Sequence, residues 1–218
     1  METRSFADYL RTLDDAALIS LFSHRPDLIT PVPPDVASLA VRASSAPSLA
    51  RAIDALNAWQ YQVLEACAIA TEPFTEKTIA ALTDKAALFV IPGLLERGLI
   101  YQSKDGFYLP TNVREVLGNE IQGLGPQTIV KLNLKKLDEA PPAAQKALEA
   151  MVWGPPRGTV ADVKKPGAGV AWLLENNFVV AANTKTVLLV REVALALRGG
   201  TLHKALQIQE PTLKTEKP

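Results

Sequence analysis

The chain has 218 residues, of which 48% are hydrophobic and 21% are charged, and its 23 Lys and Arg balance its 23 Asp and Glu. This composition is ordinary for a globular protein with a real core and excludes a largely disordered chain. No apolar run reaches the length of a membrane span, and Met1–Ser5 leads into an amphipathic segment, so neither a membrane anchor nor a signal peptide is expected.

The first 56 residues are predicted to form an N-terminal helical segment, because apolar residues recur there at helical spacing. The expected helices cover Ser5–Leu10, Asp15–Phe22, Asp35–Ala43 and the stretch from Pro47 to Leu56. Asp14 is a suitable N-cap for the second helix. The run Thr30–Pro34 must be extended, because successive prolines fix φ and remove hydrogen-bond donors.

Residues 57–118 are predicted to form a first winged-helix-like unit, in which a helical group is followed by a β-hairpin, the wing. Three helices are expected: one from Asn57 bearing Trp59, Val63 and Cys67, one from Thr75 to Leu82, and one over Ala86–Arg97 that Pro92 must kink or divide. Asp105-Gly106 lies between two β-rich runs, Leu99–Gln102 and Phe107–Leu109, and is a strong hairpin signal. A short helix over Thr111–Leu117 closes the unit.

Residues 138–200 are predicted to form a second winged-helix-like unit after a connector over residues 119–137. A helix opens at Pro141-Pro142, and a presumed recognition helix starts at Pro166 and ends at Asn176-Asn177. The β-rich runs Phe178–Ala181 and Val187–Val190 flank a polar turn and predict the second wing. Residues 201–218 are predicted to be a flexible tail. The expected fold class is therefore mainly α with small β-hairpins.

The two winged units resemble each other in sequence. Leu94-Leu95-Glu96 matches Leu173-Leu174-Glu175 at a shift of 79 residues. Each triplet is followed by two helix-ending residues, a strand, a polar turn, a second strand, a short helix and glycine. An internal duplication is the simplest explanation.

Four segments carry a resemblance to a known family: SFADYLRTLDDAALISLFSHRPDLITPVPPD, WGPPRGTV, WLLENNFVV and VREVALALRGG. Together they resemble the N-terminal region of actinobacterial helicase-associated proteins, grouped with the N-terminal domain of XPB-like helicases. The resemblance covers about residues 4–200. It implies a nucleic-acid-related setting, a partner domain or protein in a helicase assembly, and a longer parent protein. The stretch from Gly158 to Pro166 departs from this pattern, because it leaves little room for a second helix in the second unit.

No residue pattern in the chain predicts catalysis or a cofactor. A phosphate-binding loop of the form G-x-x-x-x-G-K-S/T is absent from the sequence, so an ATP-driven motor is not encoded. His24 and His203 are isolated, and neither metal binding nor a nucleophile–base pair is expected from them. Glu96 and Glu175 occupy equivalent places, which we attribute to duplication. The single Cys67 cannot form an internal disulfide, so we expect a buried thiol in an intracellular, cytoplasmic protein.

DNA binding is the functional hypothesis with the most support from the sequence, although the net charge of the whole chain is zero. Residues 1–120 hold 10 Lys or Arg against 15 Asp or Glu, whereas residues 121–218 hold 13 against 8. Cations at a helix start and on a wing suit phosphate contact. The candidate DNA-binding residues are Arg157, Lys164, Lys165, Lys185, Lys135 and Lys136.

The presumed recognition helix argues against sequence-specific binding. Its first residues, Gly167–Trp172, include no Arg, Gln or Asn that could read base edges. We therefore expect weak, non-specific contact with duplex DNA through the second unit. Two alternatives remain open: the lysines form only a solvated surface, or the chain is a protein-interaction module or scaffold that docks a partner through the helix around Ala86–Leu95 or through Trp172.

Overall fold

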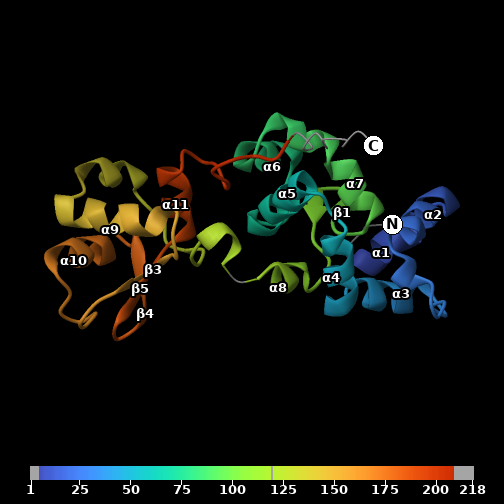
Figure 1. Ribbon diagram of the computed structural model, residues 1–218, viewed down its shortest axis with the longest axis horizontal. Coiled ribbons are helices and arrows are strands. Elements are labelled where there is room, and N and C mark those ends of the chain that lie inside the picture. The colour runs from blue at the N-terminus through green and yellow to red at the C-terminus, as the bar shows by residue number, and fades with distance from the viewer. Residues whose placement is uncertain (1–4, 119, 209–218) are drawn as a thin grey trace, which may run out of the picture. The chain divides into compact units, whose positions relative to one another are not determined.

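The computed structural model describes residues 5–118 and 120–208, and the chain divides into two compact units. Unit 1 consists of residues 1–119 and 203–218, and unit 2 consists of residues 120–202. The chain is about 53% helical and each unit carries one small antiparallel sheet (Figure 1). The prediction of a mainly α protein with small β-hairpins is confirmed. Within the described ranges, every helix is too short or too polar to cross a lipid bilayer.

The helices and strands of unit 1 are α1 (Phe6–Thr12), α2 (Asp15–His24), η1 (Pro26–Leu28), α3 (Val36–Ala43), α4 (Ala46–Asp54), α5 (Ala58–Ile69), α6 (Glu76–Leu82), η2 (Lys85–Phe89), α7 (Ile91–Glu96), β1 (Tyr101–Ser103), β2 (Gly106–Tyr108) and α8 (Val113–Leu117). Those of unit 2 are η3 (Ile121–Gly123), η4 (Leu134–Glu139), α9 (Pro142–Val152), β3 (Arg157–Thr159), α10 (Ala168–Glu175), β4 (Val179–Asn183), β5 (Thr186–Leu189) and α11 (Arg191–Leu197).

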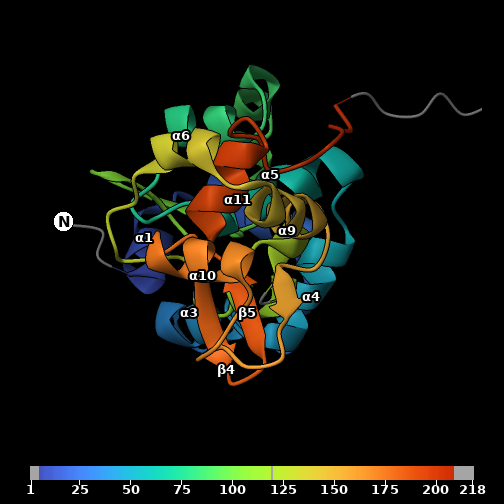
Figure 2. The same ribbon diagram turned by 90° about the vertical axis from the view of Figure 1, so that its left-hand side faces the viewer.

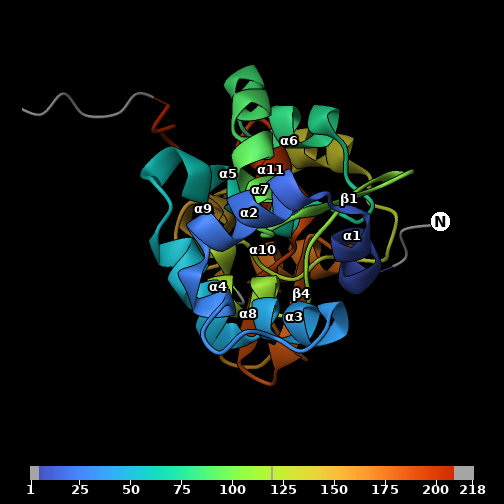
Figure 3. The same ribbon diagram turned by 90° about the vertical axis from the view of Figure 1, so that its right-hand side faces the viewer.

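The N-terminal helices share a core with the first hairpin. Figure 3 looks onto unit 1 from the side of these helices. The ring of Phe6 in α1 lies 5.6 Å from the ring of Tyr101 in β1, which in turn stacks on Tyr108 in β2 at 5.6 Å. Phe6, Tyr101 and Leu39 of α3 belong to one buried cluster. Residues 1–56 and 57–118, which we predicted as separate segments, therefore form one unit, because the aromatic face of the hairpin needs a cover.

The residues that lead into the two hairpins have the same backbone conformation in both units. Gly98 and Asn177, which are 79 residues apart, both adopt left-handed backbone, with φ of 60° and 58°. The next residue repeats the same capping bond: the Leu99 N–H donates to the Leu94 carbonyl at 3.0 Å, and the Phe178 N–H donates to the Leu173 carbonyl at 2.9 Å. Glycine and asparagine are the residues that tolerate this conformation.

The two sheets also share their strand order. In unit 2 the order is β3-β5-β4. In unit 1, β2 pairs with β1 on one side and forms an isolated antiparallel bridge with Phe74 on the other, through Phe107. Phe74 therefore takes the place that β3 has in unit 2. Only the register differs. Gln102 pairs with Phe107, but the corresponding Ala181 pairs with Val187, one residue further along, and the β4–β5 pairing has a register shift between Ala181 and Asn183.

Two helix predictions needed adjustment. The helix expected over Ala86–Arg97 is divided into η2 and α7, with Pro92 in the first turn of α7, where a missing N–H costs little. The helix expected from Pro166 begins at Ala168 with Gly167 as its N-cap. Between β3 and α10 the described chain has only a turn, whereas unit 1 has α6 and η2 between Phe74 and α7.

The connector predicted over residues 119–137 packs into unit 2, apart from residue 119, which lies outside the described residues. Gly125 approaches β5 so closely that a Cβ there would lie 1.9 Å from the Leu189 carbonyl oxygen. The Arg191 N–H donates to the Pro126 carbonyl at 2.9 Å. Only glycine permits this backbone-to-backbone approach, so the segment is held against β5 and α11.

The predicted flexible tail over residues 201–218 is wrong for its first part. Leu202 is buried in unit 2, and His203 is buried in unit 1, where its Nε2 lies 2.7 Å from a carboxylate oxygen of Glu65. Gln62 of α5 donates to the Ala205 carbonyl at 2.9 Å and accepts from the Gln207 N–H at 2.8 Å. These contacts fix residues 203–208 along α5. Residues 209–218 lie outside the described residues.

Candidate nucleic-acid interface

The loop that joins β3 to α10 runs along the turn of the β4–β5 hairpin. The Val160 N–H donates to the Lys185 carbonyl at 2.9 Å, and the Val163 N–H donates to the Thr184 carbonyl at 2.8 Å. These two bonds continue the β3–β5 pairing beyond its last register pair, Thr159 with Thr186. They bring Lys164 and Lys165, in the loop, next to Lys185, in the hairpin turn. We call these three residues the lysine tip.

Side-chain oxygens fix the backbone on both sides of the lysine tip. Asp162 Oδ1 accepts the Lys164 N–H at 2.9 Å, and Asn183 Oδ1 accepts the Lys185 N–H at 2.9 Å. Both are local turns of the kind that Asp and Asn form readily. All three lysine side chains are exposed. The loop also contributes the carboxylate of Asp162, so one negative charge stands against three positive charges in this region.

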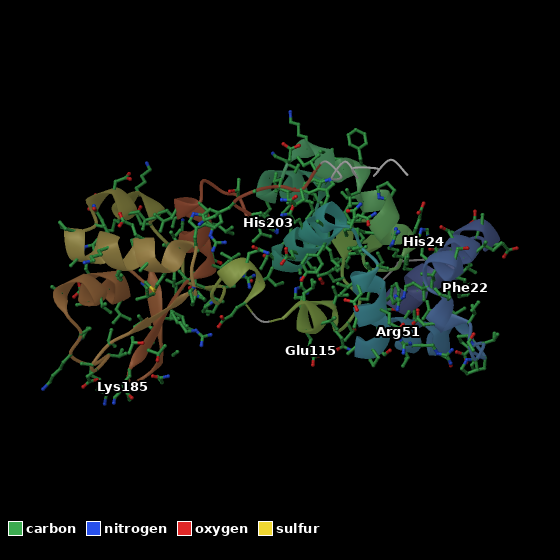
Figure 4. All side chains as sticks on the ribbon, in the orientation of Figure 1. Phe22, His24, Arg51, Glu115, Lys185 and His203 are labelled. Carbon is green, nitrogen blue, oxygen red and sulfur yellow. The ribbon has the colours of Figure 1, made fainter. Side chains whose placement is uncertain are left out.

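The figures place the lysine tip at one extremity of unit 2. Figure 4 shows Lys185 at the far end of the hairpin, directed away from the helices of its unit. In Figures 1 and 2 the hairpin turn and η4 lie at opposite ends of unit 2. A protruding, positively charged turn of this kind can approach a polyanion without the rest of the unit interfering.

Lys135 and Lys136, two of the six candidate residues, are not brought to the lysine tip. Both lie in η4, and Lys136 Nζ donates to Asn176 Oδ1 at 3.0 Å, just beyond the C-terminal end of α10. Lys164 and Lys165 precede the other end of that helix, which has 8 residues. At about 1.5 Å per residue, the helix separates the two groups by roughly 12 Å.

Arg157, another candidate residue, also lies away from the lysine tip. It opens β3 opposite Leu188, whereas the hairpin turn lies beyond Thr159 and Thr186. Its guanidinium forms an ion pair with the Glu120 carboxylate. Arg157 is therefore already paired within unit 2, and a phosphate would have to compete with Glu120 for it.

The α10 helix presents no side chains suited to base recognition. Gly169 packs against the backbone of Ala143 in α9, where a Cβ would lie 2.7 Å from the carbonyl carbon. On another side, Trp172 packs edge-on against Phe178 with the ring centroids 5.6 Å apart. The exposed end residues are Ala168 and Glu175. A helix whose exposed residues are small and apolar or acidic lacks the side chains that form base-specific hydrogen bonds in the major groove.

The two histidines each make a contact within unit 1. His24 Nδ1 lies 2.9 Å from the Ser20 carbonyl oxygen within α2, and His203 pairs with Glu65. In the part of the chain that the structure describes, no three His, Cys, Asp or Glu side chains are grouped as a metal site requires. Cys67 is fully buried in α5, and burial raises the pKa of its thiol.

The contacts that create the lysine tip could not be read from the sequence. Val160 and Val163 act through backbone N–H groups, which every residue except proline possesses. Their side chains carry no signal of that role. Glu120, which neutralises Arg157, is 37 residues away from it along the chain.

Comparison with known proteins adds no constraint: no protein-family model, curated protein or solved structure matches the chain. The function must therefore be inferred from the geometry of the two units.

Proposed function

We propose that the chain is a non-catalytic accessory module that contacts duplex DNA weakly and without strong sequence preference through the lysine tip of unit 2. The observation that supports this most directly is the pair of backbone hydrogen bonds from Val160 and Val163, because they gather Lys164, Lys165 and Lys185 on one protruding edge. Affinity of proteins for duplex DNA comes largely from such phosphate contacts.

The arrangement of unit 2 supports a winged-helix interpretation of this edge. A helix, a strand, a second helix and a hairpin follow one another, and the first strand pairs with the last in the order β3-β5-β4. The lysine tip then corresponds to the wing together with the loop before α10. The resemblance to helicase-associated proteins suits an accessory role beside a motor carried elsewhere, and a cytoplasmic location suits the lone buried Cys67.

Duplex backbone is a better proposed ligand than single-stranded nucleic acid. Binding of single strands relies on exposed aromatic side chains on which bases stack. The two stretches that carry the lysine tip, residues 160–165 and 183–186, contain no aromatic residue. Trp172 is packed against Phe178 and is not presented for stacking.

The test is a fluorescence anisotropy titration of a labelled, mixed-sequence duplex across a salt series. With three phosphate contacts, log K should fall against log salt with a slope of about −2.7, or roughly 40-fold between about 50 and about 200 mM salt. The triple variant Lys164→Glu, Lys165→Glu, Lys185→Glu should lose binding. Anisotropy that stays flat at low salt with the wild-type chain refutes the proposal.

A matched control separates the lysine tip from the general charge of unit 2. Lys131→Glu, Lys135→Glu and Lys146→Glu produce the same change in net charge on exposed side chains that belong neither to the hairpin turn nor to the loop before α10. This variant should retain most of its affinity and keep the salt slope of the wild type. Equal losses in the two triple variants would show that binding depends on overall charge and not on the lysine tip.

Protein docking through unit 1 is a second candidate function, and one observation favours it. Phe89 at the end of η2 is 89% exposed, and its neighbour Leu88 is 37% exposed. The two side chains are adjacent, and contiguous exposed apolar surface marks protein contacts. Phe89→Ser should abolish a partner complex of this kind, whereas the charge reversals at the lysine tip should leave it intact.

A further inference from the structure

A groove in unit 2 lies between η4, α9 and α11, and nothing in the proposed DNA contact uses it. Its cavity volume is about 450 Å³. Its apolar lining comes from Leu137 of η4, Leu148 and Val152 of α9, and Leu197 at the end of α11. Leu148 is nearly fully buried and belongs to the floor, whereas Leu197 is 40% exposed. The volume is in the range of preformed ligand sites in proteins.

The two charged side chains that line this groove are opposite in sign to those of the lysine tip. Asp138 of η4 and Glu149 of α9 line it, and both residues are exposed. Among the described residues, no Lys or Arg is part of the lining. This is notable because residues 121–218 as a whole hold more basic than acidic side chains, 13 against 8.

The cation that follows the groove in sequence does not neutralise it. Arg198 comes directly after Leu197, but it is only 6% exposed. Its guanidinium donates to the carbonyl oxygens of Val152, Leu202 and Gln122 at 2.7, 3.3 and 3.0 Å, and it lies 4.4 Å from the ring centroid of Trp153. The charge of Arg198 is therefore committed to holding together the two ends of unit 2.

We propose that the groove between η4, α9 and α11 binds a basic amphipathic helix of a protein partner. Aliphatic side chains of that helix would pack on Leu148, Val152 and Leu197, and flanking Lys or Arg would pair with Asp138 and Glu149. An apolar face set in a groove with charges at its edge is a recurrent mode of helix recognition. The carboxylates repel phosphate, so this surface and the lysine tip select ligands of opposite charge.

The proposal is tested with a synthetic peptide probe and the isotope-labelled full chain, observed by NMR. The probe carries Leu at i, i+3, i+4 and i+7 and Lys at its other positions, and the comparison peptide has Glu in place of every Lys. The lysine peptide should shift the amide resonances of Leu137, Leu148, Val152 and Leu197. The glutamate peptide should bind at least about tenfold more weakly.

Charge-neutralising variants check that the groove itself supplies the contacts. Asp138→Asn with Glu149→Gln should weaken binding of the lysine peptide about threefold to tenfold, as expected for two exposed ion pairs. Glu139→Gln with Glu175→Gln removes the same charge from exposed side chains outside the lining and should change the affinity less than about twofold. Equal losses in both pairs, resonance shifts confined to other surfaces, or equal affinity for both peptides would overturn the proposal. Duplex DNA that shifts the groove resonances would also overturn it. None of these outcomes depends on whether the lysine tip binds DNA.

Discussion

Replacement of Gly169 by alanine should destabilise unit 2, because α9 and α10 touch at this residue. A Cβ at position 169 would lie 2.7 Å from the Ala143 carbonyl carbon and 2.9 Å from the Ala143 carbonyl oxygen and Cβ. The carbonyl carbon and oxygen belong to the backbone of α9, and the Ala143 Cβ is fixed to that backbone, so none of the three atoms can rotate out of the way as the end of a flexible side chain can. The two helices must therefore move apart by several tenths of an ångström.

The expected magnitude combines two opposing effects. Inserting a methyl group into a close-packed contact costs about 1–3 kcal/mol. Alanine recovers up to about 1 kcal/mol over glycine in a helix, less in the first turn. We expect a net loss of about 1 kcal/mol in the free energy of unfolding of unit 2, which corresponds to a fall of about 4–8 °C in Tm for a unit of this size.

Gly167 provides a matched control two residues earlier. It is the N-cap of α10 with φ of −62°, and no atom lies within 4 Å of the position a Cβ would take. Gly167→Ala gains about 0.4–1 kcal/mol from the less flexible unfolded chain. It loses a similar amount, because alanine is a poorer N-cap than glycine. The unfolding free energy should therefore stay within about 0.5 kcal/mol of the wild type.

The assay is urea unfolding followed by tryptophan fluorescence. The chain has three tryptophans, and Trp59→Phe as a common background leaves Trp153 and Trp172, both in unit 2, as the source of the signal. A Gly169→Ala variant that unfolds at the same urea concentration as Gly167→Ala would refute the close contact between α9 and α10. Gly169→Val should enlarge the effect if the contact is as described.

The remaining predictions concern unit 1. Cys67 should react with a thiol reagent much more slowly in the folded chain than in urea, because it is fully buried and burial raises the pKa of its thiol. Rapid reaction of the folded chain would contradict the burial of Cys67 in α5. Tyr108 donates its hydroxyl to Asp105 at 2.7 Å, which raises the pKa of Tyr108 to about 12 and lowers the pKa of Asp105 below its usual value. The contact should therefore stabilise the β1–β2 turn fully between the ordinary pKa values of a carboxyl group and a phenol, about 3.9 and about 10. This stabilisation should be lost at low pH, as the pH falls through the lowered pKa of Asp105. It should also be lost at high pH, as the pH rises through the Tyr108 pKa of about 12. Titration of phenolate absorbance should show a transition near pH 12 that disappears in Tyr108→Phe, and an unchanged titration curve would refute the contact.

The sequence by itself determined the local elements. Asp14 caps α2 as predicted, and Asn57 and Thr75, at which two helices were predicted to start, cap α5 and α6. Gly98 and Asn177 end helices in left-handed backbone, and both hairpins form where turn residues separate β-rich runs. Each of these signals acts within a few residues, so it survives in any tertiary context that does not oppose it.

Only the tertiary structure decided how these elements group and which charges act together. The rings of Tyr101 and Tyr108 pack with Phe6 of α1, so the predicted segments 1–56 and 57–118 belong to one unit. Backbone bonds from Val160 and Val163 gather three of the six candidate cations, whereas Arg157 pairs with Glu120 and Lys136 bonds to Asn176. These outcomes depend on backbone N–H groups, which every residue except proline has, and on partners that are far apart in the chain. Neither leaves a periodic or local pattern in the sequence.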